Sequence, residues 1–157
     1  MQTSRLALVL IAACAGPRSP APPSPHDRAV AGLVGSWAGH ARGTPFGDFP
    51  MAIAFDRDGI GIHGRLDNGH GMYLDFRFQR EGGRWLLVEE GAIPGAGAQH
   101  STLAPVAAAG APRWADRDDP SRLAIALAVD ADTLTMTTTL HGAPHAVFEL
   151  RRVQSKL

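Results

Sequence analysis

Apolar and polar residues alternate along much of the chain beyond residue 50, which is the pattern of half-buried β-strands. In the segment 72–79, Met72, Leu74, Phe76 and Phe78 fall on every second position. Successive side chains of a strand point to opposite faces of a sheet, so these four share one face. The same period places further apolar residues on one face of neighbouring segments: Met51, Ile53, Phe55, Ile60, Ile62, Leu66, Leu134, Met136 and Leu140.

Glycine, asparagine and aspartate separate these segments into about nine expected strands. Turn sequences such as "DRDG" at 56–59 and "EGG" at 81–83 recur about every 8 to 12 residues, a spacing typical of antiparallel β-structure. We therefore predict an all-β, antiparallel up-and-down barrel of 8–10 strands, with a two-sheet sandwich as the alternative. The segment 107–120 is expected to be an irregular loop with room for one helical turn. The expected strands are 35–43, 51–57, 60–66, 72–80, 84–93, 98–106, 123–129, 133–140 and 144–153.

The N-terminus carries the features of an export signal. Arg5 precedes eight apolar residues, 6–13, a run far shorter than the ~20 residues of a membrane-spanning helix. The sequence Ile-Ala-Ala-Cys at 11–14 resembles the lipobox of bacterial lipoproteins. This resemblance implies that the signal 1–13 is removed, that Cys14 is lipidated and anchors the protein in the cell envelope, and, with Ala15 next, that the outer membrane is its address. The alternative is an ordinary signal cleaved nearby, with Cys14 discarded or left as a free thiol.

Composition divides the rest of the chain into a linker and one domain. The stretch 16–27 contains five prolines and two serines, so the segment 14–28 is expected to be an extended linker. Residues 29–157 suffice for a single core. Fifteen basic and fifteen acidic side chains cancel in net charge, which favours neither nucleic acid nor an anionic membrane face as a partner.

Both ends of this domain carry a distinctive residue pattern. Gly35-Ser36-Trp37 stands in the first expected strand, and Arg151 and Arg152 stand near the end of the last one. This pattern resembles that of the calycins, the superfamily that contains the lipocalins. In calycins a glycine-x-tryptophan packs under an arginine from near the chain's end and closes the barrel. The resemblance implies that Gly35, Trp37 and either Arg151 or Arg152 perform this closure, although the middle lipocalin signature is missing and the domain is short.

A lipocalin-like barrel implies a binding site for a small hydrophobic ligand, held without chemistry. The inward residues expected to line it are mostly apolar, and methionines supply adaptable walls. The same residues equally suit a solidly packed core without a cavity. The expected pocket residues are Met51, Ile53, Phe55, Ile62, Met72, Leu74, Phe76, Phe78, Leu134 and Met136.

Catalytic patterns find little support, so we expect a binding protein and not an enzyme. Glu89 and Glu90 are neighbours on one strand and point to opposite faces, which prevents them from acting as an acid/base pair. The acidic stretch 116–121 lacks the glycine and distal glutamate of an EF-hand calcium loop, and a solvated charge cluster is expected there.

Histidines offer an alternative function. His141 and His145 flank a turn and stand close enough in sequence to share a metal, but no third ligand is evident. The sequences around 33–50 and 145–152 also resemble nitrobindin-type barrels, which implies haem with His145 as its ligand. Strand parity places His145 outside the barrel if Phe148 and Leu150 point inward, unless a bulge at Pro144 shifts the register.

A third possibility is a structural envelope protein that acts through its outer surface. The segment "LAIALAV" at 123–129 is the one stretch that suggests an outward apolar patch, with small alanines on alternate positions. Such a face is either covered by another part of the chain or a modest contact site.

Overall fold

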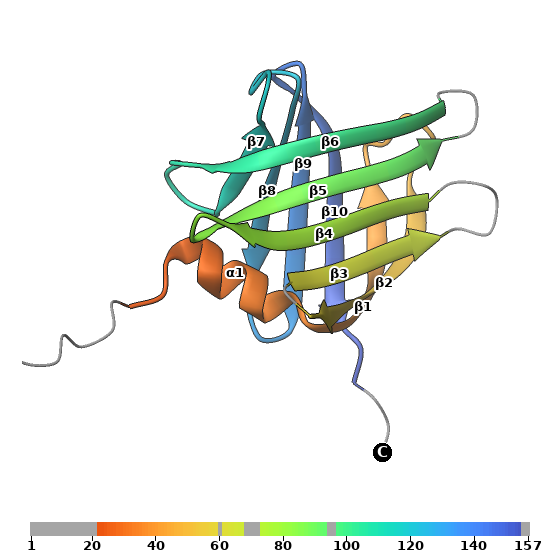
Figure 1. The fold of residues 1–157 in the computed structure, drawn as a ribbon. Helices are drawn as coiled ribbons and strands as arrows, with labels where there is room; N and C mark the ends of the chain where they lie inside the picture. The colour runs from red at the N-terminus through yellow and green to blue at the C-terminus, as the bar shows by residue number, and fades with distance from the viewer. Residues whose placement is uncertain (1–21, 60, 68–72, 94–96, 155–157) are drawn as a thin grey trace, which may run out of the picture.

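The computed structural model describes residues 22–59, 61–67, 73–93 and 97–154, and they form one helix and ten strands (Figure 1). The helix precedes all the strands. The elements are α1 (Pro25–Leu33), β1 (Gly35–Arg42), β2 (Phe49–Asp58), β3 (Gly61–Asp67), β4 (Tyr73–Glu81), β5 (Arg84–Ile93), β6 (Gly97–Val106), β7 (Arg113–Asp116), β8 (Leu123–Val129), β9 (Thr133–Leu140) and β10 (Ala143–Arg152).

The ten strands form a closed antiparallel barrel, which confirms the predicted fold class. Each strand pairs with its neighbours in sequence, and β1 pairs with β10 to complete the ring. Trp37 lies opposite Arg152 across this closing pair and opposite Ile53 across the pair with β2. In Figure 1, β3 to β6 cross in front of β8 to β10 at a steep angle. An up-and-down ring of this kind leaves no free sheet edge and is compatible with a calycin-like fold.

The interior wall is built from the alternating apolar residues that the sequence pattern indicates. Directly opposed residues of antiparallel strands share a face, so the row Gly64, Phe76 and Glu89 runs along the inside of β3, β4 and β5. Phe55 fills the space beside Gly64, where an added Cβ would lie 2.3 Å from its ring. Large side chains with less than 2 % of their surface exposed form the centre of the core: Trp37, Trp114, Phe76, Phe78, Leu33, Ile62, Leu87, Leu103, Ile125, Leu127, Leu134 and Val30.

Helix α1 was not expected, because its first residues lie in the segment assigned to the linker. Ser24 and Asp27 form a capping box, in which the Ser24 hydroxyl accepts from the Asp27 amide and the Asp27 carboxylate accepts from the Ser24 amide, at 3.1 and 2.9 Å. Pro25 occupies the first turn, where its missing amide proton costs nothing. Within the described residues, no helix is long and apolar enough to cross a membrane.

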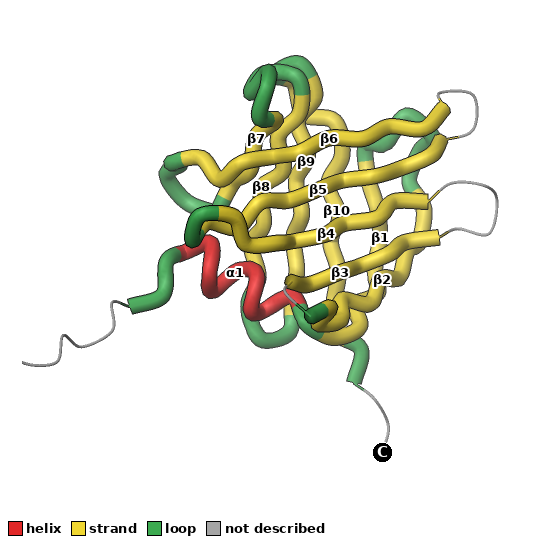
Figure 2. Tube along the Cα trace, viewed as in Figure 1, coloured by secondary structure: helices red, strands yellow, loops and turns green. Residues whose placement is uncertain are grey.

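The helix closes one end of the barrel (Figure 2). Ala29, Val30 and Leu33 form its buried face and join the barrel core. Asp27 accepts hydrogen bonds from Arg80 and from the Trp85 indole, which flank the β4–β5 turn. The hydrogen bonds from Ser24, with smaller contributions from the Trp85 indole and the Arg80 charge, lower the pKa of Asp27 to about 2. The helix is therefore an integral part of the domain, and removing residues 25–28 would break its contacts.

The junction between α1 and the barrel centres on Arg152. Its guanidinium lies 4.2 Å from the centre of the Trp37 ring and donates to the carbonyl oxygens of Gly32, Val34 and Ala131 at 2.9, 2.7 and 2.7 Å. Gly35 has a φ of 127°, and a Cβ there would lie 2.6 Å from the guanidinium. Of the two candidate arginines, Arg152 thus lies over Trp37, whereas Arg151 is exposed on the outer face.

Strand β7 corrects the expectation of an irregular loop over 107–120. Only four residues form it, and Trp114 is the one large apolar residue among them. Trp114 is fully buried, packs edge-on against Phe78 and donates to the Trp85 carbonyl oxygen at 2.8 Å. A strand this short gives too few alternating positions to be recognised in the sequence, and pairing with β6 and β8 stabilises it.

Replacing Trp37 with alanine is expected to lower the free energy of unfolding by about 3–5 kcal/mol, because it leaves a core cavity and removes the ring under Arg152. Trp37→Phe should cost less, since it keeps a ring there and loses the indole bond to the Leu33 carbonyl oxygen. Urea unfolding of the two variants measures both values. A loss below about 1 kcal/mol for Trp37→Ala would contradict the proposed closure.

Candidate functional site

The predicted pocket residues meet in the barrel interior. Leu74 is half-buried there, Met72 lies outside the described residues, and the others are at most 6 % exposed. The fully or nearly fully buried ones are Met51, Ile53, Phe55, Ile62, Phe76, Phe78, Leu134 and Met136. They form one continuous core with the buried face of α1, so the half of the barrel near α1 is filled by side chains.

A small cavity lies toward the far end of the barrel, the end opposite α1. It is lined by Leu74, Glu89, Gly91, Gln99 and Ser101, and we call it the Glu89 cavity. Strand β5 starts beside the helix at Arg84 and runs away from it, which puts Gly91 nearer the far end than Glu89. The cavity has a volume of about 10 Å³, enough for a single water molecule.

Gly91 keeps this cavity open. A Cβ at position 91 would lie 2.9 Å from Leu74 Cδ2 and 3.2 Å from the Tyr73 carbonyl oxygen. A larger residue at position 91 would therefore collide with β4 and fill the Glu89 cavity.

Glu89 is the charged side chain of this cavity. It lies opposite Phe76 on one side and Ser101 on the other, so it faces the interior. Its side chain keeps some accessible surface through the cavity, while protein surrounds most of the carboxyl group. Burial raises the pKa of Glu89 from 4.5 to about 7, and the nearby Arg122 guanidinium opposes this change. Among the described residues, the Glu89 carboxylate has no hydrogen-bond partner.

The polar groups next to Glu89 are already paired. Asp116 is 2 % exposed and forms an ion pair with Arg122, whose guanidinium also donates to the Ser101 hydroxyl at 3.3 Å. Burial alone would raise the pKa of Asp116, but the amides of Asp118 and Asp119 and the Arg122 guanidinium outweigh it and lower that pKa. Asp116 is thus a buried structural group and departs from the expected solvated cluster, whereas residues 117–121 are exposed as expected.

The sequence contained the signal for this site, although the expected pocket residues included only apolar ones and left Glu89 out. Leu87 and Glu89 share a strand parity, so an inward Leu87 implies an inward Glu89. The opposite faces expected for Glu89 and Glu90 are observed, since Glu90 is exposed and bonds to His100 at 3.1 Å. Nothing in the sequence indicated that Ser101, Asp116 and Arg122 would gather beside it.

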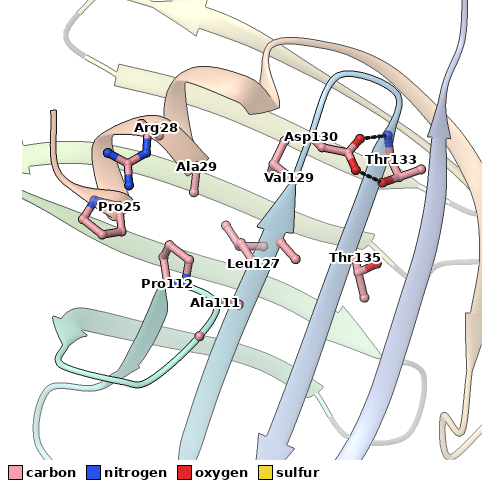
Figure 3. Close-up of a pocket in the computed structure, with 12 residues that line it drawn as sticks. Pro25, Arg28, Ala29, Ala111, Pro112, Leu127, Val129, Asp130, Thr133 and Thr135 are labelled. Atoms are coloured by element: carbon pink, nitrogen blue, oxygen red, sulfur yellow. Dashed lines mark hydrogen bonds between the residues drawn. The ribbon is translucent and has the colours of Figure 1, made fainter.

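A second depression lies outside the barrel, between α1, the β6–β7 loop and strands β8 and β9 (Figure 3). This outer groove has a volume of about 470 Å³ and is open to solvent along its length. The Asp130 carboxylate at its edge accepts from Thr133, as the dashed lines in Figure 3 show. The groove is lined by Pro25, Arg28, Ala29, Gly110, Ala111, Pro112, Leu127, Ala128, Val129, Asp130, Thr133 and Thr135.

Two histidines of the barrel wall are paired with separate carboxylates. His63 bonds to Asp75 at 2.7 Å, and His100 bonds to Glu90, both on the outer face. His145 lies at a β-bulge, where the pairing of β10 with β9 shifts between Pro144 and Ala146. Beyond the bulge Ala146 and Phe148 are buried, so the alternating side chains of residues 145 and 147 point outward. In the described part of the chain, no three histidine, cysteine or acidic side chains are grouped so as to hold a metal.

Comparison with protein-family models, curated proteins and solved structures gave no match.

Replacing Glu89 with glutamine is expected to stabilise the protein above pH 7 by up to about 3 kcal/mol, because a neutral amide avoids the cost of a buried charge. In the parent protein the raised pKa means that the folded state binds more protons between about pH 4.5 and 7. The free energy of unfolding should therefore fall as the pH rises through this window, and Glu89→Gln should flatten the fall.

Urea unfolding at pH 5 and pH 8 measures this difference. Glu90→Gln, on the outer face of the same strand, serves as the control and should change stability by less than about 0.5 kcal/mol at either pH. A pH profile that Glu89→Gln leaves unchanged would show that Glu89 is not the buried titrating group.

Proposed function

We propose that this protein is a lipid-anchored envelope protein whose barrel binds a small hydrophobic ligand without chemical conversion. The observation that carries the proposal is the asymmetry of the closed barrel. Helix α1, Trp37 and Arg152 seal one end, whereas the far half contains a cavity and a wall of mixed polarity. A barrel that is closed at one end and binds its ligand toward the other end is the arrangement that lipocalin-type carriers use.

Binding requires side chains in the far half to move. A cavity of about 10 Å³ is far smaller than the roughly 300–1,000 Å³ of typical ligand sites. Leu74 is only half-buried beside the cavity, and Met51 lies close to the β1–β2 connection. Methionine has no branch and rotates about three bonds, so it can adapt to a guest with little strain. The apolar lining of the barrel would then receive the ligand's hydrocarbon part.

Ligand binding is expected to appear as a non-covalent mass in native mass spectra of the full-length chain purified from cells, with Cys14→Ser included to prevent lipidation. Leu74→Trp, which fills the Glu89 cavity, should abolish the added mass. Val88→Trp on the outer face of β5 should retain it. A parent protein that carries and accepts no hydrophobic ligand would refute the carrier function, and a Soret absorption band lost in His145→Ala would establish haem instead.

The lipid anchor is tested separately, since Cys14 lies outside the described residues. Cys14→Ser is expected to move the protein from the membrane fraction to the soluble fraction, because a thioether-linked lipid is the only attachment that the proposal provides. Ser19→Ala, a neutral change in the adjoining segment, is the control and should leave the protein in the membrane fraction. Retention of Cys14→Ser in the membrane would exclude Cys14 as the anchor.

The outer groove supports a second candidate, an envelope protein that works through its surface. It includes Leu127, Ala128 and Val129, from the segment whose alternating alanines suggested a contact patch. At about 470 Å³ it is much larger than the interior cavity. An empty barrel in the ligand experiment would favour this candidate over the carrier.

A further inference from the structure

The Glu89 cavity presents a carboxylate without a partner to whatever enters the far half of the barrel. Its neighbours are engaged with one another: Arg122 donates to Asp116 and to the Ser101 hydroxyl. Glu89 takes part in none of these bonds among the described residues, although its side chain faces the same space. The carboxylate keeps some accessible surface and accepts no hydrogen bond from the described residues, so a hydrogen-bond donor that enters the cavity can pair with it.

Charge makes this preference specific. Asp116 and Arg122 neutralise each other, so an ionised Glu89 leaves one net negative charge among the described inward side chains around the cavity. The facing residues of the adjacent strands are Leu74 and Phe76 on β4 and Gln99 and Ser101 on β6, and none of them carries a charge. A cationic group would therefore be attracted into the cavity, whereas a second carboxylate would be repelled.

The size of the cavity restricts what Glu89 can contact. About 10 Å³ admits one small polar group and not a whole molecule. The Gln99 amide and the Ser101 hydroxyl line the same space and can accept further bonds from such a group. A primary ammonium has three donors on one small head and matches these three acceptors.

We propose that the ligand of this barrel is a cationic amphiphile whose amine head binds Glu89, with its hydrocarbon part against the apolar side chains of the barrel interior. This assignment rests on the proposed carrier function and names its substrate class. Glu89 recognises the head, and Gln99 and Ser101 complete its hydrogen bonds. The rest of the interior contributes only apolar contacts, so the choice between charged heads depends on Glu89.

The test compares two probes of equal chain length and opposite charge, n-decylamine and n-decanoate, by isothermal titration calorimetry at pH 8. The protein is the full-length chain with Cys14→Ser in every variant. The parent should bind decylamine at least about tenfold more tightly than decanoate, the effect of one hydrogen bond to a charged group. The net formal charge of the chain is zero, so non-specific attraction does not favour either probe.

Glu89→Gln keeps the shape of the side chain and should lose the preference for decylamine while still binding both probes. Glu90→Gln removes a carboxylate from the outer face of the same strand and should keep the preference. Thermal melts confirm that both variants are folded.

The outcomes separate this inference from the function on which it rests. If the parent binds both probes with equal affinity, or if Glu89→Gln retains the preference, the amine assignment is wrong and the carrier function stands. If the parent binds neither probe and carries no ligand from cells, both are wrong.

Discussion

The contact of Arg152 with Trp37 and the end of α1 is the interaction on which the remaining structure depends. One guanidinium stacks on the indole and donates to three backbone carbonyl groups. These carbonyls belong to the end of α1, to the residue before β1 and to the β8–β9 turn. Because β1 and β10 form the closing pair of the barrel, this contact fixes the two ends of the domain against each other.

Inside the barrel, apolar side chains fill the end that this contact closes, and the inward polar residues lie farther from it. Near α1 the interior is filled with Trp37, Trp114 and other large apolar groups, which exclude water. Farther along β5 and β6 the inward positions are Glu89, Gly91, Gln99 and Ser101. The partly desolvated carboxylate of Glu89 opposes folding when it is ionised, whereas an apolar residue at position 89 would avoid this cost. Charged side chains that cost stability in this way are frequent at binding sites, which supports Glu89 as a functional group.

The interior and the outer groove differ in how a ligand would be held. A guest in the far half of the barrel would be surrounded by strands on most sides, with one charged contact to orient it. The outer groove offers more volume, but Arg28, Asp130 and Thr133 along its edge already use part of their hydrogen-bonding capacity within the protein. The interior therefore offers the stronger basis for selectivity, and the groove offers the larger area of contact.

Local sequence patterns determined the β-fold, because strand alternation and turn residues depend only on near neighbours in the chain. They also determined the inward and outward faces, including the separation of Glu89 from Glu90. They missed α1, since a nine-residue helix that begins among prolines has little periodicity of its own and is stabilised by packing on the barrel end. They missed β7 for a similar reason, since four residues form a strand only between two partners.

Only the tertiary structure decided which arginine covers Trp37. Arg151 and Arg152 are neighbours in β10 and point to opposite faces, so the pairing register with β1 determines which of them lies opposite Trp37. It also brought Ser101, Asp116 and Arg122 beside Glu89 from three different parts of the sequence. Whether a charged side chain is paired, and how deeply it is buried, depends on residues far away along the chain. For that reason the sequence could indicate that Glu89 faces inward, and the fold alone showed that it does so without a hydrogen-bond partner among the described residues.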